Sequence, residues 1–346
     1  MITKRENYLT AARGGKSIWL PCFMEDANMF MLPFWRAVDP VTEKDFCGIR
    51  WVENEFGRMP DERYRAIEDI SQWHDVVKFP VLSELDWEGM RADFLKRRDP
   101  EKVDLAMLNT HGIFLIPVNM LGWVEGLCSI YENREELESF IAALTDFLVE
   151  LAGYIGKYIH PDIISTGDDV AAATGPFISK EVWDDLYKPY MKRIIDAVHA
   201  QGALAEFHCC GNCGYLIEEF LDIGADICQL PAPDEDLKRD KERFGSRLVL
   251  TGGWDRQGPG AMPDASEEEV RRSFHTAVEE WGKDGALIFW DGGIAGRSQD
   301  SRNKFLWLYD ELHKYNDERI RAWKAEHPGD GSRSQRGRFS LTHKLT

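Results

Sequence analysis

The second half of the chain alternates between short apolar runs and amphipathic helical patterns, and this alternation restricts the possible folds more than any other feature. A helical pattern follows each apolar run, and the runs are 162–167, 203–208, 225–230, 247–252 and 285–290. Strands that alternate with helices form parallel sheets, because each helix returns the chain to the edge where the next strand begins. Five consecutive units of this kind favour a β/α barrel.

The first half is less regular. Residues 17–23 and 113–118 both have the apolar composition of barrel strands. Between them, residues 36–110 contain an expected hairpin at 48–53 and an amphipathic helix near 83–97, an arrangement that is more like a cap over the barrel than a barrel unit. The sequence therefore predicts the α/β class and a TIM-type barrel with an N-terminal cap or insertion.

The composition is that of a globular protein. The chain has 346 residues, of which 43% are hydrophobic, and a β/α barrel commonly holds this length in one domain. We expect a single barrel domain over residues 1–327. Residues 328–346 are rich in Gly, Ser and Arg without periodicity, and we expect a disordered tail there.

Charge and cysteine usage exclude several classes of partner. The formal net charge of −18 opposes nucleic acid and anionic membranes, because the summed field repels phosphate. The chain opens without a signal-peptide pattern, and no uninterrupted apolar run approaches ~18 residues, so we expect a cytoplasmic protein without a membrane partner. The seven cysteines are an odd number in such a chain, and we expect reduced thiols.

Polar residues at the ends of the predicted strands are the candidates for function, because active sites of β/α barrels lie at the carboxyl ends of strands. His208 and Cys210 are two residues apart at the end of an extended segment, so their side chains point to the same side and can share one ion. Zinc suits nitrogen and sulfur ligands, and catalytic zinc sites leave one position open. We rank Asp291 first and Glu206 second as a further ligand; the alternative is a tight turn of small buried residues without metal.

Asp168 and Asp169 are the candidate catalytic acids. Two adjacent carboxylates on a strand cannot both face the barrel axis, so we expect one to face the site and the other to cap a turn. Their mutual repulsion raises the proton affinity of one, which suits a group that protonates a leaving oxygen. An Asx-type turn without chemistry remains the alternative. Candidate substrate-binding residues at other strand ends are Glu25, Asp26, Asn119 and Trp254.

In the segments that contain these candidate residues, the sequence resembles the uroporphyrinogen decarboxylase-like superfamily, and more closely its corrinoid-dependent methyltransferase branch. The resemblance extends from Glu6 to about residue 315. Its strongest segments are Gly167-Asp168-Asp169, Thr174-Gly175-Pro176-Phe177-Ile178-Ser179, Tyr187-Lys188-Pro189-Tyr190 and His208-Cys209-Cys210-Gly211-Asn212.

The resemblance implies an eight-stranded β/α barrel with the active site in a deep cleft. In the methyltransferases of this family a His-x-Cys pair and a later Cys bind zinc, which assigns His208 and Cys210 to the metal. The later Cys would fall near Asp291, where this chain has none. Uroporphyrinogen decarboxylation itself is not expected, because that enzyme presents an arginine-rich loop after its first strand. The loop here contains Glu25 and Asp26, which would repel a polyanionic tetrapyrrole.

The expected function is therefore that of a zinc-dependent methyltransferase. It would move a methyl group from a small methylated substrate, with a methoxylated aromatic as the first choice, to the cobalt of a corrinoid (cobalamin) carried by a separate protein. The chain has no corrinoid-anchoring Asp-x-His-x-x-Gly run of its own. The alternatives are a methyl-corrinoid:thiol methyltransferase, a decarboxylase of a small acid, and a barrel that binds a corrinoid or metal without catalysis.

Overall fold

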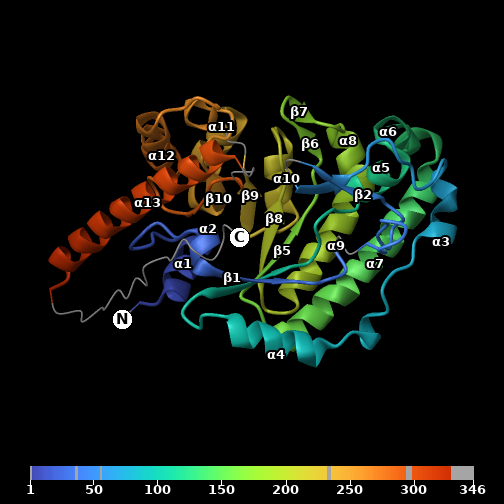
Figure 1. The fold of residues 1–346 in the computed structure, drawn as a ribbon, viewed down its shortest axis with the longest axis horizontal. Helices are drawn as coiled ribbons and strands as arrows, with labels where there is room; N and C mark the ends of the chain where they lie inside the picture. Colours follow the sequence, from blue (N-terminus) through green and yellow to red (C-terminus); the bar gives the residue numbers. More distant parts are fainter. Residues whose placement is uncertain (1, 36–37, 55–56, 232–234, 294–297, 329–346) are drawn as a thin grey trace.

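A curved parallel sheet lies at the centre of the computed structural model, which describes residues 2–35, 38–54, 57–231, 235–293 and 298–328 (Figure 1). Within these residues the sheet has seven strands in the order β1-β4-β5-β8-β9-β10-β11. Their bounds are Ala27–Met31, Val103–Met107, Ile163–Gly167, Leu204–His208, Ile227–Leu230, Leu250–Gly253 and Leu287–Trp290. The fold is the α/β TIM-type barrel that the alternation predicts.

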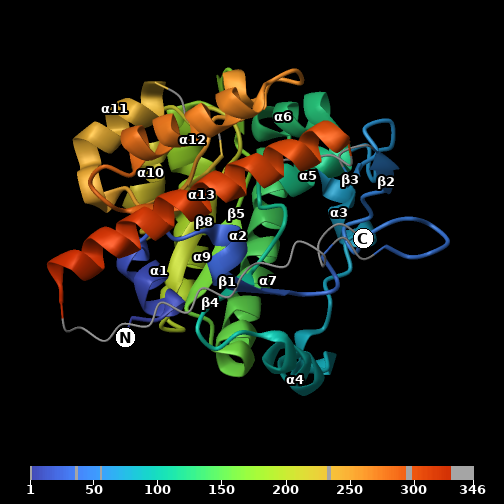
Figure 2. The ribbon, with the colours of Figure 1, turned by 60° about the vertical axis from the view of Figure 1, so that its left-hand side comes forward.

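Helices surround this sheet on its outer side (Figures 1 and 2). Beside β9 and β10 lie α11 (Glu235–Phe244), α12 (Glu267–Trp281) and α13 (Gln299–Glu326). At the other end lie α4 (Trp87–Arg97), α7 (Arg134–Ile159) and α9 (Lys188–His199). The shorter helices are α1 (Lys4–Ala12), α2 (Phe23–Asp26), α3 (Trp73–Val76), α5 (Leu115–Leu121), α6 (Trp123–Glu132), α8 (Lys180–Val182) and α10 (Leu216–Asp222).

The second half of the barrel follows directly from its sequence pattern. Each of the five predicted apolar runs overlaps a strand of the sheet. The strands β9 and β10 are buried at every position, as strands covered on both faces must be. The helices begin at capping residues. Ser266 and Glu269 form a reciprocal capping box at α12, and Ser179 and Ser298 cap α8 and α13.

The first predicted strand, 17–23, is not a regular strand. Its contact with the sheet is one parallel bridge between Cys22 and Phe289 of β11. Side chains take the place of a second strand partner: Asn316 of α13 bonds both the N–H and the carbonyl of Leu20. Arg319 donates to two further carbonyls, those of residues 17 and 18. These contacts hold the segment at the edge of β11 without a ladder.

The strand predicted at 113–118 is wrong, because this segment forms the start of α5. Asp168 accepts hydrogen bonds from the backbone N–H groups of Phe114 and Leu115, which caps the helix. Pro117 falls in the first turn, where its missing N–H costs no helical hydrogen bond. The barrel strand is instead β4, ten residues earlier, inside the segment 36–110 that we expected to be a cap.

The rest of that segment contains the expected local elements. The hairpin is formed by β2 (Trp51–Asn54) and β3 (Gly57–Pro60), and the amphipathic helix is α4. A second, smaller hairpin, β6 (Ala171–Ala172) with β7 (Gly175–Pro176), follows β5. The expected disordered tail lies almost wholly outside the described residues.

Among the described helices, α7 is long and apolar enough to cross a membrane by length and composition. However, 56% of its most apolar window is buried inside the protein. Leu144, Leu148 and Leu151 are fully buried, and the helix packs against α9, so α7 has the character of a core helix.

Gly153, in the middle of α7, offers a test of local helix energetics. A Cβ added there would meet nothing within 4 Å. We expect Gly153→Ala to raise the free energy of unfolding by about 0.5–1 kcal/mol, because alanine loses less backbone entropy in a helix. Gly156→Ala in the same helix is the matched control, since its Cβ would lie 2.4 Å from Gln201 Oε1. Urea denaturation measures both, and an equal gain at Gly156 would contradict the packing.

Candidate metal centre

The carboxyl ends of β5 and β8 meet closely because Gly167 pairs with His208 in the parallel register. A Cβ at Gly167 would lie 2.7 Å from the Cβ of His208, so glycine permits this approach. The turn after His208 also requires a glycine. Gly211 has a φ of 82°, and a Cβ there would lie 2.6 Å from the carbonyl oxygens of Ala171 and Ala172. The β6–β7 hairpin therefore fixes the turn that carries Cys210.

His208, Cys210 and Asp169 form a cluster at this point. His208 Nε2 lies 3.3 Å from Cys210 Sγ and 3.6 Å from Asp169 Oδ1. The backbone N–H of Cys210 donates to the same Oδ1 at 2.8 Å. One ligand atom from each residue lies within 4.8 Å of the other two, and no other three His, Cys, Asp or Glu residues in the described ranges gather in this way. All three are partly exposed, so the cluster is accessible from solvent.

The distances from His208 Nε2 to the other two ligand atoms fit a tetrahedral divalent ion. From usual zinc bond lengths, the nitrogen–sulfur edge of a tetrahedral site is about 3.5 Å and the nitrogen–oxygen edge about 3.4 Å. The corresponding distances in the cluster are 3.3 and 3.6 Å. Nitrogen, sulfur and oxygen together are a donor set that zinc accepts, and three protein ligands leave a fourth position open.

The ionisation of the cluster also suits a metal. Burial lowers the pKa of His208, so its imidazole is neutral and has a lone pair to donate. Burial raises the pKa of the Cys210 thiol, and the negative charge of Asp169 raises it further. A divalent ion would reverse this effect, because its charge stabilises the thiolate.

Asp168 lies next to the cluster but in different surroundings. It is 2% exposed and accepts the N–H groups of Phe114 and Leu115, whereas Asp169 faces the cluster. The two carboxylates, which both follow the last residue of β5, therefore lie in different surroundings. Burial is the main cause that raises the pKa of Asp168 to about 7. Asp168 ties the start of α5 to the end of β5.

Comparison with known proteins identifies the family of this barrel. Residues 50–292 match the family Uroporphyrinogen decarboxylase (URO-D), and this segment contains the whole cluster. The chain belongs to the uroporphyrinogen decarboxylase family. Among curated protein sequences, none matches the chain.

One solved structure shares the fold of this chain at low sequence identity. A methyltransferase from Methanosarcina mazei is 14% identical, with a TM-score of 0.64, over 91% of this chain and 99% of that chain. An endo-β-1,4-xylanase from Gloeophyllum trabeum is 10% identical with a TM-score of 0.37, over 58% of this chain and 65% of that chain. The first similarity shows a common fold, and the second is too distant to say more.

The two carboxylates that we ranked as further ligands lie outside the cluster of this uroporphyrinogen decarboxylase-type barrel. Glu206 is fully buried below His208, where it accepts hydrogen bonds from Gln229 Nε2 at 3.0 Å and from Thr251 Oγ1 at 2.9 Å. Asp291 is buried and accepts the backbone N–H of Gly293 at 2.8 Å. Asp169, which we expected to act as an acid, lies in the place where a third ligand was sought.

The residues predicted to bind substrate are dispersed. Glu25 lies on α2 and contacts His313 of α13 at 2.8 Å, and Asp26 accepts the N–H of Cys22. Trp254 is buried, and its Nε1 donates to Ser273 Oγ on α12. Asn119 lies on α5, and its buried amide nitrogen has no hydrogen-bond partner in the described part of the chain. A role in substrate binding remains a prediction for each of them.

Trp290 and His111 lie near the barrel mouth and were not predicted. The ring of Trp290, at the end of β11, meets the His208 ring edge to face at a centroid distance of 6.0 Å. His111 follows β4, and its ring lies 5.2 Å from that of Trp51 in the hairpin. The signal for His111 was present, since Asn109-Thr110-His111-Gly112 ends a short apolar run. This signal was missed because the predicted strand was placed at 113–118, after His111.

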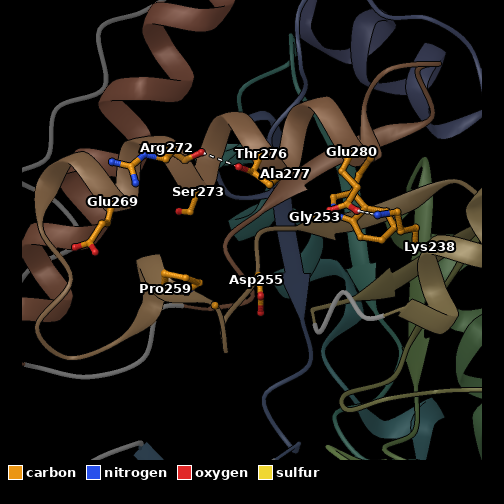
Figure 3. A pocket seen from close by; sticks show the side chains of 12 residues that line it. Lys238, Gly253, Asp255, Pro259, Glu269, Arg272, Ser273, Thr276, Ala277 and Glu280 are labelled. Carbon is orange, nitrogen blue, oxygen red and sulfur yellow. Dashed lines mark hydrogen bonds and ion pairs between the residues drawn. The ribbon is translucent and has the colours of Figure 1, made fainter.

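A cavity of about 590 Å³ lies away from this cluster, between the loop after β10 and the helices α11 and α12 (Figure 3). Its polar side chains are already paired: Lys238 bonds Glu280 at 2.8 Å, and Ser273 bonds Trp254. Arg272 bonds Glu268 at 2.7 Å. The cavity therefore presents no convergent free polar groups that would define a ligand.

Proposed function

We propose that this protein is a methyltransferase that takes a methyl group from a small methoxylated aromatic compound and delivers it to the cobalt of a separate corrinoid protein. The observation that carries the proposal is the accessible cluster of His208, Cys210 and Asp169 at the ends of β5 and β8. The family membership and the fold shared with a methyltransferase support it.

In this proposal His208, Cys210 and Asp169 hold zinc, and Asp169 replaces Asp291 and Glu206 as the third ligand. Zinc bound there would supply a Lewis acid for the ether oxygen of the substrate. A methyl ether needs such help because its leaving group is a poorly stabilised phenoxide or alkoxide. A carboxylate donates less electron density than a second thiolate, which favours polarisation of a substrate oxygen over activation of a bound thiol.

The residues around the cluster have supporting roles. Trp290 provides an aromatic ring against which a methoxyarene can pack, next to His208. Asp168 holds the start of α5 beside the cluster through its two backbone contacts, and thereby positions Asp169. The exposed side of the cluster leaves room for the corrinoid protein to approach.

The test is a methyl-transfer assay with the zinc-loaded protein, reduced cobalamin as acceptor and a panel of methoxyarenes as donors. We expect methylcobalamin and the demethylated phenol in equal amounts, measured by absorbance and by chromatography. Methylated thiol formed from methylcobalamin and a free thiol would indicate the thiol methyltransferase instead. Release of CO₂ from small acids would indicate a decarboxylase, and bound zinc without any turnover would leave a metal-binding barrel.

A further inference from the structure

Arg256 lies at the barrel mouth, in the loop after β10, and its side chain is held there by a glycine. A Cβ added at Gly292 would lie 2.3 Å from Cδ and 2.9 Å from Cγ of Arg256. The alkyl stem of the arginine therefore packs on the bare backbone after β11. The Cβ added at Gly292 would also lie 3.1 Å from Cβ of Pro231, which follows β9. The arginine stem is thus placed over the carboxyl ends of neighbouring strands.

The guanidinium end of Arg256 is exposed and makes no hydrogen bond or ion pair with the residues that the structure describes. Many other arginines of the chain do have a carboxylate partner, as Arg243 has Glu218 and Arg271 has Glu267.

The loop on which the arginine stem packs adjoins the cluster through β11. Gly292 lies two residues after Trp290, and the centroid of the Trp290 ring lies 6.0 Å from that of the His208 ring. Arg256 is also among the charged groups that act on both His208 and Cys210. The positive charge therefore lies on the side of the cluster that faces β11.

We propose that Arg256 binds a carboxylate of the substrate, so that the preferred methyl donors are methoxylated aromatic acids and not neutral methoxyarenes. A guanidinium presents two parallel N–H groups to a carboxylate, and this geometry fixes direction as well as distance. An acid held at one end by Arg256 would direct its methoxy group toward His208 and Cys210. This inference rests on the proposed function and names its substrate class.

The experiment compares 4-methoxybenzoate with neutral 4-methoxytoluene, which has nearly the same shape. For Arg256→Gln we expect KM for the acid to rise about tenfold or more, because charged hydrogen bonds of this kind contribute that much to binding. KM for the neutral ether, kcat and zinc content should stay unchanged. Arg256→Lys should recover part of the lost affinity, since lysine keeps the positive charge but not the two parallel N–H groups. The control is Arg97→Gln, at an exposed position on α4, because it removes one positive charge as Arg256→Gln does.

A binding measurement separates this inference from the proposed function. Calorimetric titration of the zinc-loaded protein with 4-methoxybenzoate requires no turnover. Binding that is lost in Arg256→Gln but kept in Arg97→Gln supports the inference even if no methyl transfer occurs. No binding to the wild-type protein, equal binding to both variants, or an equal loss of acid and neutral donor would overturn it, the last because Arg256 would then act on the cluster itself.

Discussion

Cys210→Ala is expected to remove bound zinc and to lower methyl transfer by more than about 100-fold, since changes to groups that merely support metal ligands already cost ~10–100-fold. The variant retains a neutral imidazole and one carboxylate, too few ligands to hold zinc tightly. His208→Ala should have the same result. Metal analysis of the purified proteins and the cobalamin assay measure the two effects separately.

Cys209→Ala is the matched control for that result. Cys209 precedes Cys210, is fully buried, and its thiol lies 3.3 Å from the carbonyl oxygen of Cys210, outside the cluster. This variant should keep its zinc. Full zinc occupancy in both Cys210→Ala and His208→Ala would show that the cluster is not the metal site. Zinc lost from Cys209→Ala alone would lead to the same conclusion.

A third pair of variants separates the two candidate carboxylate ligands. Asp169→Asn should weaken zinc binding, because the amide oxygen carries no charge and ligates poorly. Asp291→Asn should retain zinc, because Asp291 lies outside the cluster. The reverse result would restore the assignment that we drew from the position of Asp291 at the end of the last strand.

The barrel could be predicted from the second half of the sequence because its signals are local. Each strand there lies in or overlaps a short, mostly apolar segment that a helical pattern follows, and serine caps mark the starts of α8, α12 and α13. The first half lacks such agreement between local and global structure. Residues 113–118 are as apolar as a strand, but α5 begins within them because Asp168, 54 residues after Phe114 in the chain, caps the helix.

The candidate site was accessible to sequence reasoning only where its residues are close in the chain. His208 and Cys210 share one strand end, so their spacing predicts their proximity. Asp169 joins them because β5 pairs with β8, and Arg256 because Gly292 leaves space for its stem. Both contacts depend on strand register and on the path of a loop. Asp168 and Asp169 do lie in different surroundings, but both follow the end of β5, and the sequence did not indicate which of them faces the cluster.

Glu206→Gln should change the pH dependence of stability. Burial raises the pKa of Glu206 to about 7, against an ordinary value of 4.5 for a glutamate side chain. The folded state therefore holds a proton that the unfolded state releases, and the stabilisation is complete below pH 4.5 and decreases as the pH rises to 7. The difference corresponds to about 3 kcal/mol. Glutamine does not titrate, so the free energy of unfolding of the variant should rise relative to that of the wild type as the pH increases through this range. Above it the difference should stay constant.

Urea denaturation between pH 4.5 and 8.5 measures this difference, and Glu219→Gln is the matched control. Glu219 is also buried, but it pairs with Lys180 at 2.5 Å and with Lys188 at 2.7 Å, so removal of its charge should destabilise the protein at pH 8. The two Glu→Gln exchanges should therefore have opposite signs at that pH. Parallel stability curves for Glu206→Gln and the wild type would contradict the burial argument. Loss of zinc from Glu206→Gln would instead make Glu206 a ligand, because a residue that only fills the barrel interior should leave the metal in place.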